Sequence, residues 1–424
     1  MSAVAIRRRQ GIASRDSVAA RARSVRRRVG AAWGLLFFNT LTYIPGGLLH
    51  IPSHIGKGLA QASLPLAILV ALTVNPRIRL RPNVFLCLIS LLIVDTVFTA
   101  VQVHHLGTMY RTARLIEFLI GLWLLTPWWG RRDMLLLRYQ LRCLYVALGS
   151  VGLGLLLSPG KALGTYGGRL SGVIWPMGPT QVAQYAAVAA GLTMVLWLTR
   201  LVSGRAALSG VIFAVVILLL THTRTALLGL VVGTVVACLS LFIVNARVRR
   251  FFAVVVATVS LGVVTVAGFI TAWLARGENA QGLTSLTGRT NFWALVLNTP
   301  RTKFQEIFGF GLSNASVNGL PIDSNWLSAY MQEGLFGVTV CAMILVFLLV
   351  AAFFQPPGVR RALVLFIVTY CLLASFTEDA FTDVSTYMLH LTVAASLLMG
   401  PLAGLRARRD ESPAFSESGL LPEH

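Results

Sequence analysis

The chain has 424 residues, of which 56% are apolar and only 12% are charged, whereas soluble domains carry about 25% charged residues. This composition excludes an ordinary soluble domain. Apolar runs recur from Ala31 to Met399, and each is about twenty residues long, enough to cross roughly 30 Å of hydrocarbon as a helix. The short alternating pattern of an outer-membrane barrel does not occur in these runs, so they indicate a helical membrane protein.

The apolar runs predict an all-α, polytopic bundle of about twelve transmembrane helices. The domain organisation expected is an Arg-rich tail at 1–30, a transmembrane domain at 31–403 and a second tail at 404–424. The seventh and eighth helices are divided only by "LLLTHTRTALL". The expected helices are centred near residues 40, 66, 92, 119, 148, 190, 214, 234, 262, 344, 369 and 393.

Charge predicts the orientation of these helices. Most of the 36 Lys and Arg residues lie in the two tails and in alternate loops, and basic residues near span ends stay in the cytoplasm. Both termini are therefore expected in the cytoplasm. The net charge of +21 is explained by this topology and by attraction to anionic membrane lipid. The tail lacks aromatic residues between its arginines, which argues against nucleic acid as a partner.

The tail through Arg28 is expected to be a disordered, retained anchor rather than a cleaved signal. The five cysteines all lie in apolar helices, so neither a disulfide framework nor a zinc site is expected. Arginine greatly outnumbers lysine, as in a GC-rich bacterial genome, and the expected location is the bacterial cytoplasmic membrane.

Two expected extracytoplasmic loops, 158–181 and 275–324, are much longer than the others. Long loops inside compact proteins are usually functional. The larger one lies between the ninth and tenth helices. Within it, "SLTGRTNFWALVLNTP" predicts a short amphipathic helix that Pro300 helps to end, with Ser285 or Thr287 as its N-cap.

The same loop ends in two further signals. "FGFGLSNASVNG" is typical of a tight glycine turn, and "PIDSNW" begins a new helix with Asp323 or Ser324 as its N-cap. A simple capping role is therefore one interpretation of Asp323.

Arginines on the expected outer side depart from the usual charge rule. Arg224, in "THTRTALLGL", lies close to membrane depth, where an unpaired charge costs about 3 kcal/mol or more. A guanidinium carries five donors that suit phosphate oxygens. The alternative is a salt bridge to an acid within the bundle. The arginines concerned are Arg111, Arg114, Arg169, Arg224, Arg276, Arg289 and Arg301, and the candidate acids for Arg224 are Asp95, Glu117 and the Glu378–Asp379–Asp383 group.

Arg169 in "GGRLSG" and Arg289 in "TGRTNFW" lie in flexible, glycine-flanked settings. Each could reach a phosphate, and each could equally be a solvated loop charge. Arg111 and Arg114 are one helical turn apart, with Glu117 a further turn on. We interpret them first as an internal ion-pair row and second as an anion site.

Histidines and acids on the outer side give weaker signals. Several histidines are expected near the outer face, but none has the spacing of a metal site, and ordinary hydrogen bonding is the favoured role. His222 is the exception, because it lies two residues from Arg224. No external D-x-D motif is present, and "EDAFTD" could supply a general base or be a solvated loop.

Four stretches, taken in order, resemble the O-antigen ligase and polymerase family of bacterial glycan assembly. They span roughly Arg169 to Gly337, and the twelve-helix plan with a large late outer loop agrees with the family. The stretches are "GGRLSGVIWP", "THTRTALLGL", "TGRTNFWALVLNTP…IFGFGLSNA" and "DSNWLSAYMQEGLFG".

The resemblance implies a GT-C-like glycosyltransferase that needs no metal or other cofactor. Its donor would be a glycan on a polyprenyl diphosphate, and an acceptor hydroxyl of a glycan or lipid-glycan would displace the diphosphate with inversion. By analogy, Arg224 and Arg289 hold the diphosphate and Arg169 matches a further family arginine. Such arginines would stabilise the leaving diphosphate. A protein that sets chain length is a further candidate partner.

The chain departs from the family at two places. Many ligases have His-Asn where this chain has Ser324-Asn325, and the His is the expected acceptor-side base. Asp323 is the nearest ionisable group here, and a carboxylate could accept the hydroxyl proton. This departure weakens a lipid A–core ligase in particular. The other departure is "WPMGPTQ", where family members often show Pro-Asn.

Four aromatic residues are candidates for stacking on sugars, or alternatively for the interfacial belt of a membrane protein. The belt is favoured for Trp326. These residues are Tyr166, Trp175, Trp293 and Trp326.

Two other functions fit the sequence less well. A twelve-span solute or lipid-linked glycan transporter would normally have a long central cytoplasmic loop between two six-helix halves, but that connection is only "RLVSGR". A cell-wall glycan polymerase of the shape-and-division type would need an external carboxylate arrangement that is not evident in the sequence.

Overall fold

The computed structural model describes residues 3–41, 47–48, 52–255, 257–258, 289–313, 316–317, 320–378 and 381–400. Its named secondary-structure elements are helices, apart from one hairpin whose strands, β1 (Ser316–Val317) and β2 (Leu320–Pro321), have two residues each. The helices are α1 (Ala3–Asn39), α2 (Ser53–Val74), α3 (Val84–Val103), α4 (Leu106–Leu124), η1 (Thr126–Trp128), α5 (Leu135–Leu157), α6 (Pro159–Gly164), α7 (Pro179–Leu198), α8 (Gly204–Leu220), α9 (Arg224–Phe242), α12 (Arg289–Leu297), α13 (Lys303–Phe308), α14 (Asn325–Phe353), α15 (Val359–Ala374) and α16 (Thr386–Leu398).

The polytopic helical class is supported by six described helices that are long and apolar enough to cross a membrane. They are α2 from His54, α3, α5, α7, α9 and α14, while α8 and α16 are shorter apolar helices. The expected seventh and eighth helices are separate, because α8 ends at Leu220 and α9 begins at Arg224. The span expected near residue 262 lies outside the described residues.

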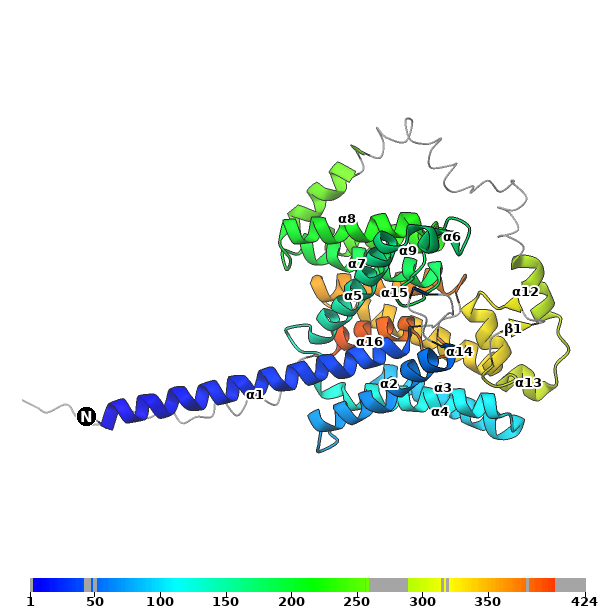
Figure 1. Ribbon diagram of the computed structural model, residues 1–424, viewed down its shortest axis with the longest axis horizontal. Helices are drawn as coiled ribbons and strands as arrows, with labels where there is room; N and C mark the ends of the chain where they lie inside the picture. Colours follow the sequence, from blue (N-terminus) through cyan, green and yellow to red (C-terminus); the bar gives the residue numbers. More distant parts are fainter. Residues whose placement is uncertain are drawn as a thin grey trace, which may run out of the picture.

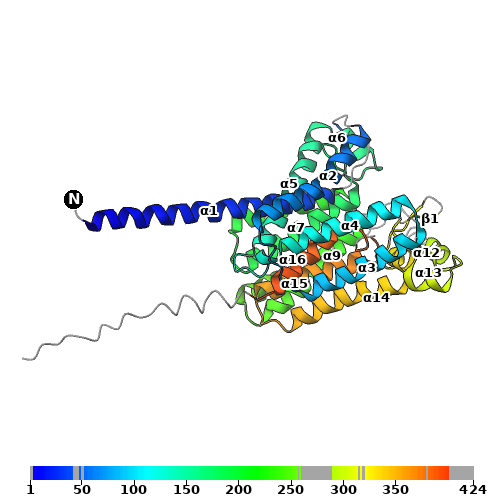
Figure 2. The ribbon, with the colours of Figure 1, turned by 90° about the horizontal axis from the view of Figure 1, so that it is seen from below.

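The basic tail differs from its prediction. Disorder was expected through Arg28, but a single helix, α1, runs from Ala3 to Asn39. Alanine and arginine are both strong helix formers, which accounts for the difference. The helix ends at Asn39, so it stops near the centre of the first expected span. Figures 1 and 2 show α1 projecting from the bundle, with only its C-terminal part packed against other helices.

Loops that follow alternate helices contact one another at one end of the bundle, which we call the basic end. Arg81 Nη1 donates to the carbonyl of Trp129 at 2.9 Å, and Arg360 Nη2 donates to the carbonyl of Arg131 at 2.9 Å. These are the loops expected in the cytoplasm. The remaining loops meet at the other end of the helices, where the candidate site lies.

Helix α7 occupies the centre of the bundle, and most of its residues are buried. Small residues on and around it allow this close packing. Gly191 of α7 and Gly233 of α9 both face the ring of Phe366 on α15. A methyl group at Gly191 would overlap that ring, so the centre of the bundle is set by small residues packed against one aromatic side chain.

Helix α14 is broken near its start. Gly334 has φ 65° and ψ −160° inside the helix, a conformation that favours glycine. The predicted glycine turn fills the break: Phe310 N donates to the carbonyl of Met331 at 2.8 Å, and Gly311 N donates to that of Gln332 at 2.9 Å. Gly309 and Gly311 have φ 76° and 84°, so the turn is confirmed. Figure 2 shows α12, α13 and the hairpin gathered at this end of α14.

Candidate functional site

The site begins with Arg169, in the loop between α6 and α7. Its Nε donates to the carbonyl of Thr221 at 3.0 Å, and Nη2 donates to Thr223 Oγ1 at 3.1 Å. The next backbone amide, of Leu170, donates to the carbonyl of Leu220 at 2.9 Å. Arg169 is therefore held against the turn between α8 and α9. Its side chain, which was expected to lie in a flexible loop, has defined contacts there.

That turn carries two further predicted residues. His222 has φ 49°, which is uncommon outside glycine and worth attention at a functional site. It is half-buried between the buried residues Thr221 and Thr223. Arg224 follows as the first residue of α9 and is also half-buried. The structure thus brings together Arg169, His222 and Arg224 around two threonines.

The turn is joined to the loop between α15 and α16, residues 375–385. Thr377 Oγ1 donates to Thr225 Oγ1 at 2.9 Å. On its other side, this loop binds the start of α14: Asn325 N donates to the carbonyl of Ser375 at 2.9 Å, and Phe381 N donates to Asn325 Oδ1 at 2.6 Å. Three of the stretches that carry the family resemblance therefore meet through one loop.

The start of α14 confirms part of the prediction for "PIDSNW". Ser324 is the N-cap residue, although its side chain makes no capping hydrogen bond. Ser324 and Asn325 are 4% and 0% exposed. Asp323 precedes them, is not the N-cap, and is half-buried. Of the two expected N-cap residues, the structure therefore has Ser324 at the N-cap position.

The same loop carries the ion pairs of Arg111 and Arg114. Asp383 Oδ2 lies 3.1 Å from Nη1 of Arg111 and 3.8 Å from Nη1 of Arg114. Arg114 also donates to Asn39 Oδ1 from Nε at 3.1 Å. Within the described ranges Glu117 forms no ion pair, so the expected row with Glu117 is wrong. The partner is Asp383 of "EDAFTD", which lies far away in the sequence and could not be found by helical spacing.

The acids expected as possible salt-bridge partners of Arg224 differ in the contacts they make. In the part of the chain that the structure describes, Asp95 and Glu117 make no ion pair, and Asp383 pairs with Arg111 and Arg114. Glu378 remains, because it follows Thr377, which binds the residue next to Arg224. The alternative of a salt bridge for Arg224 is thereby reduced to Glu378 and to Asp379, which lies outside the described residues.

Three helices begin at this loop or are bonded to it at their first turn: α9 at Arg224, α14 at Asn325 and α16 at Thr386. Helix N-termini carry partial positive charge and exposed N–H groups, which favour anions. Arg169 and Arg224 add positive charge beside these N-termini, and Glu378 and Asp383 of the loop add negative charge.

Arg289 and Trp293 belong to α12, which confirms the predicted short helix, ended before Pro300. Its expected N-caps, Ser285 and Thr287, and the side chain of Arg289 lie outside the described residues. Helix α12 packs on α14, and Trp293 is half-buried there. The role of Arg289 stays a prediction.

Two other candidate aromatics pack against rings of the protein. Trp175 lies 4.8 Å from Phe38 between ring centroids, and Trp326 lies 6.1 Å from Phe376. The carbonyl of Tyr166 accepts a hydrogen bond from Arg169 N at 3.3 Å. These contacts account for the position of Trp175 and Trp326, and sugar stacking by any of the three stays a prediction.

Arg301 has a structural role in the segment that carries α12 and α13. Its Cζ lies 3.9 Å from the ring centroid of Tyr330, and Nη2 donates to the carbonyl of Val296 at 3.0 Å. The guanidinium therefore clamps the end of α12 onto α14. Arg276, the remaining arginine expected on the outer side, lies outside the described residues.

Sequence reasoning missed the break in α14 and the burial of Glu333 beside it. Glu333 is fully buried next to Gly334. Asp95 of α3, which packs on α14, is also buried, and neither of its carboxylate oxygens has a hydrogen-bond partner among the described residues. The "MQEGLFG" glycines were a signal for the break, but an isolated glycine in a membrane helix is common. Over the described ranges, no group of three His, Cys, Asp or Glu side chains has the arrangement of a metal site.

The sequence matches no protein-family model, and a search of curated proteins finds no match. The resemblance to the O-antigen ligase and polymerase family therefore rests on the four stretches quoted above, and it stays a prediction.

Proposed function

We propose that this chain is a membrane glycosyltransferase that ligates or polymerises polyprenyl-diphosphate-linked glycan in surface polysaccharide and cell-wall biogenesis. The transfer takes place at the outer face of the bacterial cytoplasmic membrane, is inverting and needs no metal. In this proposal the bundle has about twelve spans in a GT-C-like arrangement, and both termini are cytoplasmic. Its partners are the lipid-linked donor, a glycan or lipid-glycan acceptor and membrane lipid.

One observation carries the proposal. Arg169, His222 and Arg224 gather around Thr221 and Thr223, and the loop bonded to this turn also holds Ser324 and Asn325 next to Asp323. Arg169, Arg224 and three helix N-termini thus lie around a single loop, with the carboxylate of Asp323 beside it, while Asp383 of that loop is already paired with Arg111 and Arg114. Such a site can bind a diphosphate and offer a base on its acceptor side.

Each residue then has a chemical role. Arg224 and Arg169 bind the diphosphate and stabilise the negative charge that develops as it leaves, and Arg289 of α12 joins them. Asp323 accepts the proton of the acceptor hydroxyl. Asn325 holds the loop between α15 and α16 in place through Phe381 and Ser375.

The test compares lipid extracts from cells that carry the native protein, Arg224→Ala or Arg224→Lys, at matched levels in the membrane. A lysine keeps the charge but lacks the planar fork. Build-up of polyprenyl-diphosphate glycan together with loss of surface polymer is expected for Arg224→Ala, with a smaller build-up for Arg224→Lys. The length of the stalled glycan separates a polymerase from a ligase. Arg205→Ala is the control and should behave as the native protein, because Arg205 is an exposed arginine in the first turn of α8, at the end of the helix away from the site.

Unchanged lipid-linked glycan in Arg224→Ala would contradict the proposal. If solute uptake changed instead, the transporter would replace the glycosyltransferase. The two results are distinguishable because they are read from different pools, the lipid extract and the transported solute.

A further inference from the structure

A groove lies between α5 and the end of α7, away from the candidate site. Its volume is about 590 Å³, which is within the range of roughly 300–1,000 Å³ found for sites that take organic molecules. It lies at the basic end of the bundle, because it is lined by the first turns of α5 and by the loop that follows α7. Its apolar lining comes from Leu137, Leu141, Val146, Leu196, Leu201 and Val202.

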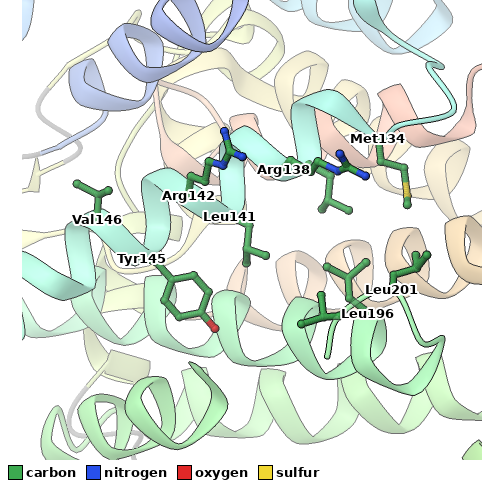
Figure 3. Close-up of a pocket in the computed structure, with 10 residues that line it drawn as sticks. Met134, Arg138, Leu141, Arg142, Tyr145, Val146, Leu196 and Leu201 are labelled. Carbon is green, nitrogen blue, oxygen red and sulfur yellow. The ribbon is translucent and has the colours of Figure 1, made fainter. Parts of the chain in front are cut away.

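Two arginines border this apolar surface. Arg138 and Arg142 are four residues apart and therefore lie on the same face of α5; both are exposed. Figure 3 shows them rising from successive turns, while Leu141 and Tyr145 extend toward Leu196 and Leu201. Arg142 Cζ lies 5.7 Å from the ring of Tyr139. Neither guanidinium forms an ion pair with any residue the structure describes, and the nearby Asp133 already pairs with Arg26 and Arg131.

The position of the two arginines along α5 matches the level of a lipid headgroup in the membrane. Helix α5 is a candidate span that begins at Leu135, so Arg142 lies about 10 Å along its axis at 1.5 Å per residue. Guanidinium groups near the end of a span reach the interface, while Val146 and Leu201, 74% and 52% exposed, lie where acyl chains would be. A soluble anion would use the arginines and leave the apolar wall empty.

We propose that this groove binds one anionic phospholipid from the leaflet at the basic end, with its phosphate between Arg138 and Arg142 and its acyl chains against the apolar wall. Basic pockets between membrane helices bind anionic headgroups by this chemistry. The site is independent of the transfer reaction proposed above, since it shares no residue with it.

The experiment is native mass spectrometry of the full chain released from detergent after equilibration with phosphatidylglycerol or with phosphatidylethanolamine of identical acyl chains. The native protein should retain phosphatidylglycerol in preference. Arg138→Gln with Arg142→Gln should lower that preference by about 30-fold, which corresponds to about five-fold for each arginine at a membrane surface. Arg138→Lys with Arg142→Lys should keep most of it, which separates loss of charge from misfolding. Arg132→Gln, an exposed arginine just before α5, should change nothing.

A second variant tests the groove itself. Val146→Trp keeps both arginines but fills the apolar wall, and it should reduce phosphatidylglycerol retention. Unchanged retention in Val146→Trp would show that the arginines act only as a surface patch and would overturn the groove. Two results would overturn the proposal that the ligand is an anionic phospholipid. One is equal retention of the two lipids by the native protein. The other is a thermal-shift assay in which inorganic phosphate stabilises the protein as much as phosphatidylglycerol does.

Discussion

Thr377 donates a hydrogen bond to Thr225 at 2.9 Å, and this contact joins the first turn of α9 to the loop between α15 and α16. The two residues are 152 positions apart in the chain. Arg224 lies on one side of the contact and Glu378 on the other. The bond therefore sets where the N-terminus of α9 stands relative to the loop that holds Asn325.

Thr377→Val should loosen this connection while keeping the shape of the side chain. We expect a loss of about 0.5–1.5 kcal/mol in stability, as for one intramolecular hydrogen bond, and a larger relative fall in glycan transfer because Arg224 is displaced. The measurements are thermal unfolding in detergent and surface polymer at matched protein levels.

Thr234→Val is the matched control for this change. Thr234 is on α9, as is Thr225, the partner of Thr377, and the Thr234 hydroxyl has no hydrogen-bond partner among the described residues, so its removal should be neutral or stabilising. Equal effects of Thr377→Val and Thr234→Val would show that the contact has no special role.

The mutual approach of Gly309 and Gly334 supports a second prediction. A Cβ atom at Gly334 would overlap the backbone of Ile307 and Phe308, and one at Gly309 would overlap that of Gln332 and Glu333. Gly334→Ala also forces a non-glycine residue to φ 65°, which by itself costs about 1–3 kcal/mol. We expect a lower unfolding temperature and loss of transfer, measured on the purified and the membrane-bound protein respectively.

Gly34→Ala provides the comparison. Gly34 is inside α1, and a Cβ there meets nothing within 4 Å. Replacing glycine by alanine in a helix interior stabilises it by roughly 0.5–1 kcal/mol. A Gly334→Ala protein as stable as Gly34→Ala would contradict the close docking of the glycine turn in the break of α14.

Local sequence patterns predicted the helical class, the short helix at α12, the glycine turn and an N-cap at Asp323 or Ser324, because each depends on neighbouring residues. They also singled out Arg169, in the long expected loop 158–181, and Arg224, in the short connection between the seventh and eighth expected helices. They did not predict that Asp383 would pair with Arg111, 272 positions earlier. Nor did they predict the break at Gly334, since that break is stabilised by the backbone of residues 309–311 rather than by its own neighbours.

For the N-terminal tail, the sequence predicted too little order. Its charge and lack of large apolar residues indicate disorder, whereas the structure has the helix α1 from Ala3. Helix propensity and continuity with the packed part of α1, where Trp33 donates to Gln140 at 2.9 Å, outweigh the repulsion among its arginines.

Arg301 supports a third prediction, on stability rather than on transfer. Arg301→Gln removes the cation–π contact with Tyr330 and the hydrogen bond to Val296; such cation–π contacts contribute about 0.5–2 kcal/mol. Chymotrypsin should then cleave within 289–313 several-fold faster, because α12 is no longer held on α14. Lys303→Gln, an exposed position two residues away, should leave the cleavage rate unchanged, and equal rates for both variants would contradict the clamp.

Asp323 supports the last prediction, which concerns the chemistry of transfer. It is half-buried, precedes the N-cap Ser324, and lies beside the residues that bind the loop between α15 and α16. If its carboxylate accepts the proton of the acceptor hydroxyl, Asp323→Asn keeps the size of the side chain and removes the base. General base catalysis contributes about 10²–10⁴-fold, so transfer should fall by at least the lower figure while the unfolding temperature stays close to native. Glu306→Gln, an exposed acid on α13 in the same outer loop, should retain full transfer. Full activity of Asp323→Asn would assign the proton to another group, and Glu378, next to the contact between Thr377 and Thr225, would then be the first acid to replace.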